Sequence, residues 1–348
     1  MDRFQGVLGI AVIFGLVFAV SKYRTRINWR ILGAGFALQV ITAFLILKWE
    51  PGFQALQALS GGVSWLVGFA NQGTTFVFAG LFNNDQIGFV FALGVLPVII
   101  FIGALIGLLY YLRVIQWFIE IVGTAMKWLV GVSKIESVWA TTVIFLGMSE
   151  APLVIQPYLK KLTKSALFTC MVGGFASVAG STLVGYSLLG APLPYLIAAS
   201  VMNAPASLVI AKGLWPETEE SDLDASVRDV RDTESVNVID ALARGALTGG
   251  HLAVIVGCLL IAFIAVIVMA NGALSGVAGW FGAPWLTFDV LFGWIFAPVA
   301  WLIGVPWQDA ALTGNFIGQK TVLNEFVAFS NFGPMVQAGN LNPKTELV

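Results

Sequence analysis

Several stretches of this chain are apolar over at least the length of a bilayer crossing. Gly88–Leu112 and Gly249–Leu274 contain no Asp, Glu, Lys or Arg. A helix needs about 20 apolar residues to cross the hydrocarbon core of a membrane. In this chain 58% of the residues are hydrophobic and 11% are charged, whereas soluble domains carry about 25% charged residues. The sequence therefore predicts an all-α polytopic membrane protein, because segments this long and continuous do not fit barrel strands.

The distribution of basic residues predicts the orientation of the chain in the membrane. Lys and Arg gather in the loop after the first apolar segment, on both sides of Glu150, and in the loop before Gly249, while residues 51–86 and 270–319 contain none. Cytoplasmic loops are enriched in Lys and Arg, so we expect a multi-pass protein of the cytoplasmic (inner) membrane with its amino terminus outside. The expected full spans are Phe4–Ser21, Ile31–Trp49, Gly88–Leu112, Ala166–Leu189, Leu193–Leu214 and Gly249–Leu274.

Glu150 lies between two apolar runs, close to Pro152. An ionisable residue at bilayer depth usually faces a wet cavity or a substrate path, and proline interrupts the helical hydrogen-bond ladder. Basic residues at both ends of Ser133–Leu159 place both ends on the cytoplasmic side. The segment is too short for two crossings of about 20 residues each. It is therefore expected to form a re-entrant hairpin, hairpin 1, at 133–164.

A second segment, Asp309–Phe332, interrupts its apolar surroundings with Lys320, Asn324 and Glu325 and is expected to enter from outside. Two hairpins that enter from opposite faces, each with one Glu, are typical of an inverted-repeat transporter. The second repeat is incomplete, since two expected spans do not follow hairpin 2. We expect scaffold helices with an outer interfacial helix at 1–86, followed by a first repeat at 87–214 that contains an inner interfacial helix. An acidic cytoplasmic linker at 215–248 then leads to the second repeat at 249–332, which contains an outer interfacial helix and hairpin 2 at 306–332. A polar tail at 333–348 is expected to follow.

Four short motifs in this order resemble the concentrative nucleoside transporter family. The resemblance covers nearly the whole chain and implies two further membrane helices that this sequence lacks. It also implies a homotrimer, in which each protomer holds a nucleoside between the two hairpin tips and two unwound helices. The implied activity is cation symport by an elevator-like movement. The motifs are Gly147-Met148-Ser149-Glu150-Ala151-Pro152, Pro216-Glu217-Thr218-Glu219, Gly304-Val305-Pro306-Trp307 and Thr321-Val322-Leu323-Asn324-Glu325-Phe326-Val327-Ala328.

The resemblance also implies which residues contact the substrate. Gly147, Met148, Ser149 and Glu150 match the positions that hold the nucleobase, and Asn324 and Glu325 match positions that hold the ribose. The family usually has Gln where this chain has Met148. Gln donates to and accepts from a base edge, whereas Met only packs against it. We therefore expect a changed base preference.

The positions that match the family's sodium site are Val143, Leu146, Ser177 and Val178. Sodium-coupled members have Asn where this chain has Val143, and hard cations prefer oxygen ligands. Sodium binding is therefore expected to be weakened or lost. The sequence favours H+ over Na+ as the coupling ion, with Glu150 or Glu325 as the titrating group, because desolvation raises the pKa of a carboxyl group.

Other interpretations remain open at this point. Glu150 could pair with Lys160 or Lys161, and Glu325 with Lys320, for structural reasons alone. The small residues around Ser177 are also typical of close helix packing. Aromatic stacking on a base is open for three residues, Phe145, Phe175 and Phe326.

The alternative functions are transport of another polar solute on the same scaffold, and an inactive fragment of a transporter. An enzyme is disfavoured, because an intramembrane hydrolase would need a His, Cys or metal partner for its acids. His251 is the single histidine, and the two cysteines lie in apolar stretches. We expect no cofactor, no bound metal and no nucleic-acid partner; the lipid bilayer and a nucleoside are the expected partners.

Overall fold

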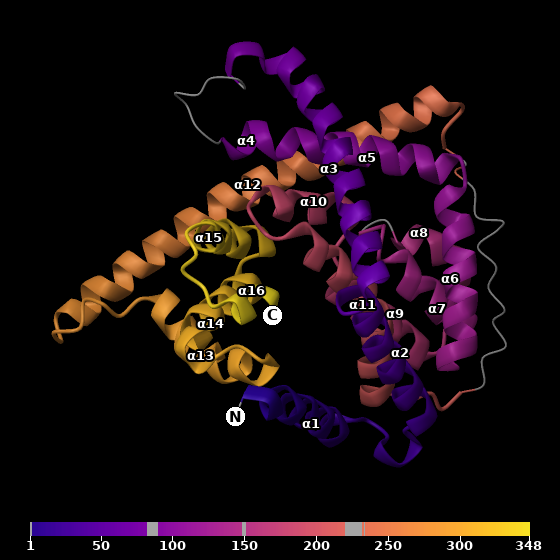
Figure 1. Cartoon of the computed structure of the whole chain (residues 1–348), viewed down its shortest axis with the longest axis horizontal. Coiled ribbons are helices and arrows are strands. Elements are labelled where there is room, and N and C mark those ends of the chain that lie inside the picture. The colour runs from indigo at the N-terminus through magenta and orange to yellow at the C-terminus, as the bar shows by residue number, and fades with distance from the viewer. Residues whose placement is uncertain (1, 82–89, 148–150, 220–231, 233) are drawn as a thin grey trace. The chain divides into compact units, whose positions relative to one another are not determined.

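The computed structural model describes residues 2–81, 90–147, 151–219, 232 and 234–348. These residues form α-helices and short 3-10 helices, and none of them is in a strand (Figure 1). The expected all-α fold class is confirmed. Four helical segments of the described chain are long and apolar enough to cross a membrane: Trp29–Leu47, Phe91–Tyr111, Leu193–Leu214 and Val238–Gly279.

The chain divides into two compact units that each combine distant segments. Unit 1 contains Met1–Gly15, Tyr186–Pro192 and Leu252–Val348, and unit 2 contains Leu16–Gly185 and Leu193–His251. The expected division into consecutive segments differs from this grouping, because helices that are far apart in the sequence pack against each other. Three borders between the units fall inside α1 (Asp2–Val20), α10 (Gly180–Leu188) and α12 (Val238–Gly279), and the fourth lies at the start of α11 (Leu193–Leu214).

Unit 2 contains the helices from α2 to α9 and α11. The 29-residue α3 and the amphipathic α6 occupy the two positions where interfacial helices were expected. Hairpin 1 contributes α7 and α8, which pack in one apolar core with α6 and α9. The bounds are α2 Trp29–Leu47, α3 Glu50–Phe78, α4 Phe91–Gly94, α5 Leu96–Tyr111, α6 Val114–Val130, α7 Lys134–Thr142, α8 Ala151–Ile155, α9 Lys164–Ala176 and α11 Leu193–Leu214.

Helices α5 and α12 cross closely because glycines face each other. A Cβ at Gly103 would lie 2.8 Å from the Gly245 carbonyl oxygen, and one at Gly249 would lie 2.7 Å from the Ile99 carbonyl oxygen. Gly103 and Gly107 on α5, like Gly245 and Gly249 on α12, are four residues apart and lie on one helix face. Small residues at this spacing let membrane helices approach to backbone contact.

Two expected spans need correction. Ala166–Leu189 is not one helix, because Ser177 is extended (φ −93°, ψ 163°) and separates α9 from α10. The sixth helix, expected at Gly249–Leu274, runs from Val238 to Gly279. The turns added before Gly249 contain Asp240 and Arg244, and at the helix start the Asn237 side chain accepts a hydrogen bond from the Asp240 N–H at 2.9 Å. A side-chain acceptor there satisfies one of the unpaired N–H groups at a helix start.

Unit 1 contains α13 (Phe288–Ile303), α14 (Trp307–Val322), α15 (Glu325–Gln337) and α16 (Pro343–Leu347). Helices α13 and α14 meet at 115° and pack tightly, since a Cβ at Gly314 would lie 2.7 Å from the Gly293 carbonyl oxygen. The outer interfacial helix expected before hairpin 2 corresponds to α13.

The segment expected as a polar tail, 333–348, is largely helical. Residues 333–337 complete α15, and α16 follows. The Asp309 carboxylate accepts hydrogen bonds from the Asn342 N–H at 3.0 Å and the Thr345 hydroxyl at 2.6 Å, and Thr345 is 4% exposed. Two groups of the tail, the Asn342 N–H and the Thr345 hydroxyl, thus bind the segment to α14.

Candidate functional site

Hairpin 1 begins with a capping box. Ser133 Oγ accepts from the Glu136 N–H, and the Glu136 carboxylate accepts from the Ser133 N–H at 3.1 Å. This reciprocal pair satisfies exposed donors at the start of α7. Lys134 forms an ion pair with Glu120 of α6 at 2.6 Å, so the first turn of the hairpin is also held against α6.

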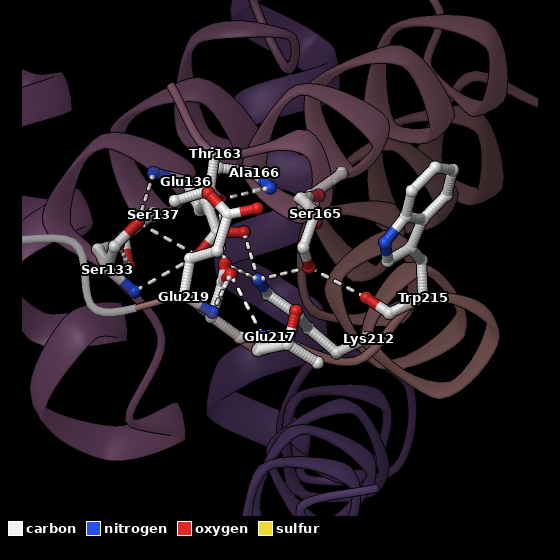
Figure 2. Close-up of polar contacts among 12 residues, drawn as sticks. Ser133, Glu136, Ser137, Thr163, Ser165, Ala166, Lys212, Trp215, Glu217 and Glu219 are labelled. Carbon is white, nitrogen blue, oxygen red and sulfur yellow. Dashed lines mark hydrogen bonds and ion pairs between the residues drawn. The ribbon is translucent and has the colours of Figure 1, made fainter. Parts of the chain in front are cut away.

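A buried lysine connects both ends of hairpin 1 (Figure 2). Lys212, near the end of α11, is 3% exposed. Its Nζ lies 2.6 Å from a carboxylate oxygen of Glu136, at the start of the hairpin. It also donates to the Ser165 hydroxyl at 2.9 Å, just after the hairpin ends, and to Glu217 at 3.1 Å. An unpaired buried ammonium would be very costly, and here it has two carboxylates and a hydroxyl around it.

Glu217 extends this cluster to the segment after α11. Burial raises the pKa of its carboxyl, but the Lys212 ammonium, the Thr163 hydroxyl and the Glu219 N–H outweigh burial and hold that pKa below its usual value. Thr163 also caps α9 by accepting from the Ala166 N–H at 3.0 Å. The cluster therefore fixes the base of hairpin 1 to α9 and α11 with the Glu217 carboxyl ionised.

The other end of α7 meets the break between α9 and α10. The Gly180 N–H donates to the Phe145 carbonyl at 3.2 Å, and a Cβ at Gly147 would lie 3.1 Å from the Ala179 Cβ. The turn after α7 and the unwound segment are therefore adjacent. Irregular backbone of this kind is tolerated at membrane depth where it lines a cavity or is buried in protein.

This junction brings together Val143, Leu146, Ser177 and Val178, the residues expected at the cation site. Val143 and Leu146 are 1% and 4% exposed and pack in the apolar core of the hairpin. Ser177 supplies the one side-chain oxygen of the set, and its hydroxyl donates to the Gly174 carbonyl at 3.1 Å. No described residue donates a hydrogen bond to the Val143 carbonyl. Within the described part of the chain, this oxygen is therefore open to a ligand.

Close helix packing, the other interpretation of the small residues around Ser177, holds for the glycines that precede it. Gly173 and Gly174 are buried, and a Cβ at Gly173 would lie 3.1 Å from the Trp139 indole nitrogen. Gly173 thus makes room for the side chain of Trp139, and the break between α9 and α10 follows at Ser177. Three of the expected nucleobase residues, Met148, Ser149 and Glu150, lie outside the described residues.

The tip of hairpin 2 lies between α14 and α15. Asn324 is the N-cap of α15, and its side-chain oxygen accepts from the Val327 N–H at 3.0 Å. Glu325 is partly buried in the first turn, and no described residue pairs with its carboxylate. The structural pairing with Lys320 is therefore not seen, and no described residue accepts from the Asn324 amide NH2 group or pairs with the Glu325 carboxylate, which leaves both open to a ligand within the described part of the chain.

Two of the three aromatic candidates already have protein partners. Phe326 is 5% exposed and packs edge-on against Tyr186, with ring centroids 4.7 Å apart. Phe145 makes a similar contact with Phe118 at 5.0 Å. Phe175 is 71% exposed.

Sequence reasoning missed the roles of Lys212 and Glu136. The one available signal was that Lys212 ends an otherwise apolar helix, which is also typical of an interfacial lysine. Among the described residues, no group of three or more His, Cys, Asp or Glu side chains could hold a metal ion.

Long apolar helices, a helix broken beside a hairpin and a second hairpin with a carboxylate at its tip define a secondary membrane transporter. Three family models match in sequence: "Na+ dependent nucleoside transporter N-terminus" at residues 8–81, "Nucleoside recognition" at 92–193, and "Na+ dependent nucleoside transporter C-terminus" at 195–348. The chain belongs to the Na+ dependent nucleoside transporter family.

Three bacterial relatives match over most of their length. An uncharacterized transporter, YutK, of Bacillus subtilis is 44% identical, with 100% of this chain and 86% of that protein covered. The putative nucleoside permease NupX of Escherichia coli is 39% identical, with 99% and 85% covered. The nucleoside permease NupC of Helicobacter pylori is 41% identical, with 94% and 79% covered.

Solved structures match equally well. CNTnw in an inward-facing substrate-bound state superposes with a TM-score of 0.94 at 44% identity, covering 100% of this chain and 84% of that one. A CNTnw variant in an outward-facing state gives a TM-score of 0.95, again at 44% identity, with 100% and 85% covered. The expected nucleoside transporter family is confirmed, as is the expectation of a transporter instead of an enzyme. That the family has two further helices stays a prediction.

Proposed function

We propose that this protein imports nucleosides across the cytoplasmic membrane by coupling their uptake to a cation gradient. The observation that carries the proposal is the match to CNTnw in a substrate-bound state over 100% of this chain at 44% identity. Hairpin 1 supplies Gly147, Met148, Ser149 and Glu150 for the nucleobase, and hairpin 2 supplies Asn324 and Glu325 for the ribose. The free Glu325 carboxylate supports this assignment, since a carboxylate accepts hydrogen bonds from hydroxyl groups.

The proposed cycle is an elevator-type alternating access in a homotrimer with the amino terminus outside. Support for alternating access comes from CNTnw, which has been captured both inward-facing and outward-facing with TM-scores of 0.94 and 0.95 to this chain. Support for the orientation comes from the basic residues of the loops, which the positive-inside rule places in the cytoplasm. Cross-linking of the protein in membranes tests the trimer.

The coupling ion is proposed to be H+, on the chemistry of the candidate cation residues. Val143, Leu146 and Val178 offer only backbone oxygens, and sodium prefers several oxygen ligands. Na+ is the second candidate, favoured by the family description and by the available Val143 carbonyl. In the H+ mechanism, Glu150 or Glu325 carries the proton across the membrane.

Uptake into proteoliposomes tests these assignments. We expect saturable uptake of adenosine or uridine that follows an imposed pH gradient, and Glu325→Gln to abolish or strongly weaken it. If no nucleoside competes for uptake, the transporter carries another polar solute. If uptake follows a sodium gradient and ignores pH, the proposal of H+ coupling is wrong while the nucleoside assignment stands.

A further inference from the structure

A chain of amide and carboxylate groups crosses the four helices that carry hairpin 2. Asn331 of α15 donates to the Gln319 side-chain oxygen of α14 at 2.9 Å. Gln319 donates through Nε2 to the Asp289 carboxylate of α13 at 3.1 Å. Asn271 of α12 donates to the other Asp289 oxygen at 2.7 Å, and its own oxygen accepts the Phe288 N–H at 2.8 Å. All of these residues lie in unit 1.

The carboxylate of Asp289 gives this chain its direction. An ionised carboxylate only accepts hydrogen bonds, so both neighbouring amides must turn their NH2 groups toward it. Gln319 is then left with its oxygen facing Asn331, and Asn271 with its oxygen facing the Phe288 N–H. Each hydrogen bond of the chain leads to Asp289, either directly or through a neighbouring amide. The donors and acceptors of the four side chains therefore match in one orientation.

Gln319 is the central residue of the chain. Its side chain makes three hydrogen bonds, to Asp289, Asn331 and, at 3.3 Å, Asn315, and the residue is 5% exposed. A buried amide that lost these partners would pay a desolvation penalty. Among the described residues, the Asn331–Gln319 bond is the one side-chain hydrogen bond between the two arms of the hairpin.

The backbone of Gln319 also reaches the tip of the hairpin. Its carbonyl accepts the Leu323 N–H at 2.8 Å, immediately before Asn324. On the other arm, Asn331 follows Glu325 by six residues on the same helix. One residue therefore holds α14 on α13, holds α15 on α14, and fixes the last hydrogen-bonded residue before the tip.

We propose that Gln319 is a positioning residue for substrate binding, which holds Asn324 and Glu325 in place through its bonds to Asp289 and Asn331. This inference rests on the proposed contact of Asn324 and Glu325 with the ribose. It assigns a role in nucleoside affinity to residues that need not touch the nucleoside. A site held by locked side chains loses affinity when its support becomes loose.

The first test replaces Gln319 with methionine, which has a similar length and no amide. KM for adenosine and uridine uptake in proteoliposomes is expected to rise about tenfold, since two to three hydrogen bonds are lost. The matched control is Asp309→Asn on the same helix, because Asp309 binds the segment around Thr345 and lies outside the chain of amides. The control is expected to lower the melting temperature and leave KM unchanged.

The second test moves the carboxylate along the chain. Gln319→Glu alone places two carboxylates against each other and should raise KM more than Gln319→Met does. Adding Asp289→Asn restores one consistent set of donors, since the new amide at position 289 would donate to the new carboxylate at position 319 and accept from Asn271, and Asn315 can turn its amide. The double variant is expected to return KM to within about threefold of wild type.

Two results would overturn the inference: a wild-type KM in Gln319→Met with only a lower melting temperature, or a double variant no better than Gln319→Glu. If Gln319→Met does not fold, the comparison of Gln319→Glu with the double variant decides. Failure of the proposed function is distinct, because the wild-type protein would then take up neither nucleoside, or Glu325→Gln would leave uptake unchanged.

Discussion

A buried lysine with two carboxylate neighbours marks the base of hairpin 1. The side chains of Lys212 and Glu136 are 4% and 2% exposed, and their charged atoms lie 2.6 Å apart. A buried ion pair is weak evidence of net stabilisation, because desolvation offsets much of the attraction. Removal of one partner, however, leaves an uncompensated buried charge, and this asymmetry gives a test at the scale of single residues.

Lys212→Met is expected to destabilise the protein by about 3–5 kcal/mol, because Glu136 would stay buried without its cation. The double variant Lys212→Met with Glu136→Gln is expected to recover part of that loss, since the deeply buried carboxylate is removed and the remaining one, Glu217, has a side chain that is 30% exposed to solvent. The melting temperatures of the purified proteins in detergent give the comparison.

The matched control is Arg244→Met. Arg244 also pairs with two carboxylates, Glu234 and Asp240, but its side chain is 48% exposed. Exposed pairs contribute about 0–1 kcal/mol, so this variant is expected to melt close to wild type. Equal losses in the lysine and arginine variants would mean that the buried cluster contributes no more than a surface pair.

The residues that sequence reasoning found and those that it missed differ in a physical way. Glu325 stood out because a carboxylate in an apolar stretch is costly wherever its partners lie. Lys212 and Gln319 matter through partners that are distant in sequence, Glu136 and Asp289, and such pairings follow only from the packing of the helices. The sequence therefore predicted the tip of hairpin 2 and left out its supports.

At the scale of helices, the apolar pattern predicted where most elements lie but not where one of them breaks. Ala166–Leu189 reads as one span because all its residues are uncharged. The break at Ser177 depends on a tertiary contact, the bond from the Gly180 N–H to the Phe145 carbonyl of hairpin 1. The turns of α12 before Gly249 were missed because Asp240 and Arg244 interrupt their apolar pattern.

The crossing of α5 and α12 gives a prediction at this scale. Gly245→Ala is expected to destabilise the protein by about 1–3 kcal/mol, because its Cβ would lie 2.5 Å from the Gly103 carbonyl oxygen and 3.0 Å from the Ala104 Cα. These are backbone atoms, so the helices themselves must move apart. Thermal unfolding in detergent measures the effect.

Gly250→Ala on the same helix is the control. Nothing lies within 4 Å of a Cβ at that position, and alanine is favoured over glycine in a helix by roughly 0.5–1 kcal/mol. This variant is expected to melt at or slightly above the wild-type temperature. A Gly245→Ala protein as stable as Gly250→Ala would show that the crossing tolerates a methyl group.

At the scale of the whole molecule, each hairpin belongs to a different compact unit. Hairpin 1 and the α9–α10 break lie in unit 2, and hairpin 2 with its chain of amides lies in unit 1. The proposed cation residues thus share a unit with Gly147 of hairpin 1. In the proposed cycle, an ion bound at Val143 and Ser177 would act first on hairpin 1.

Val143→Asn tests which ion drives this cycle. In the apolar core of hairpin 1, an Asn amide without a partner is costly, but its side-chain oxygen adds a ligand beside the Val143 backbone oxygen and Ser177. We expect uptake by the variant to require sodium and its melting temperature to rise with sodium concentration, because an ion that binds only the folded state stabilises it. Val143→Leu, which adds no oxygen, is expected to show neither effect. Uptake by the wild-type protein should follow the pH gradient, and its melting temperature should be the same in sodium chloride and choline chloride. If wild-type uptake required sodium instead, the ion would be assigned to backbone oxygens and the Ser177 hydroxyl.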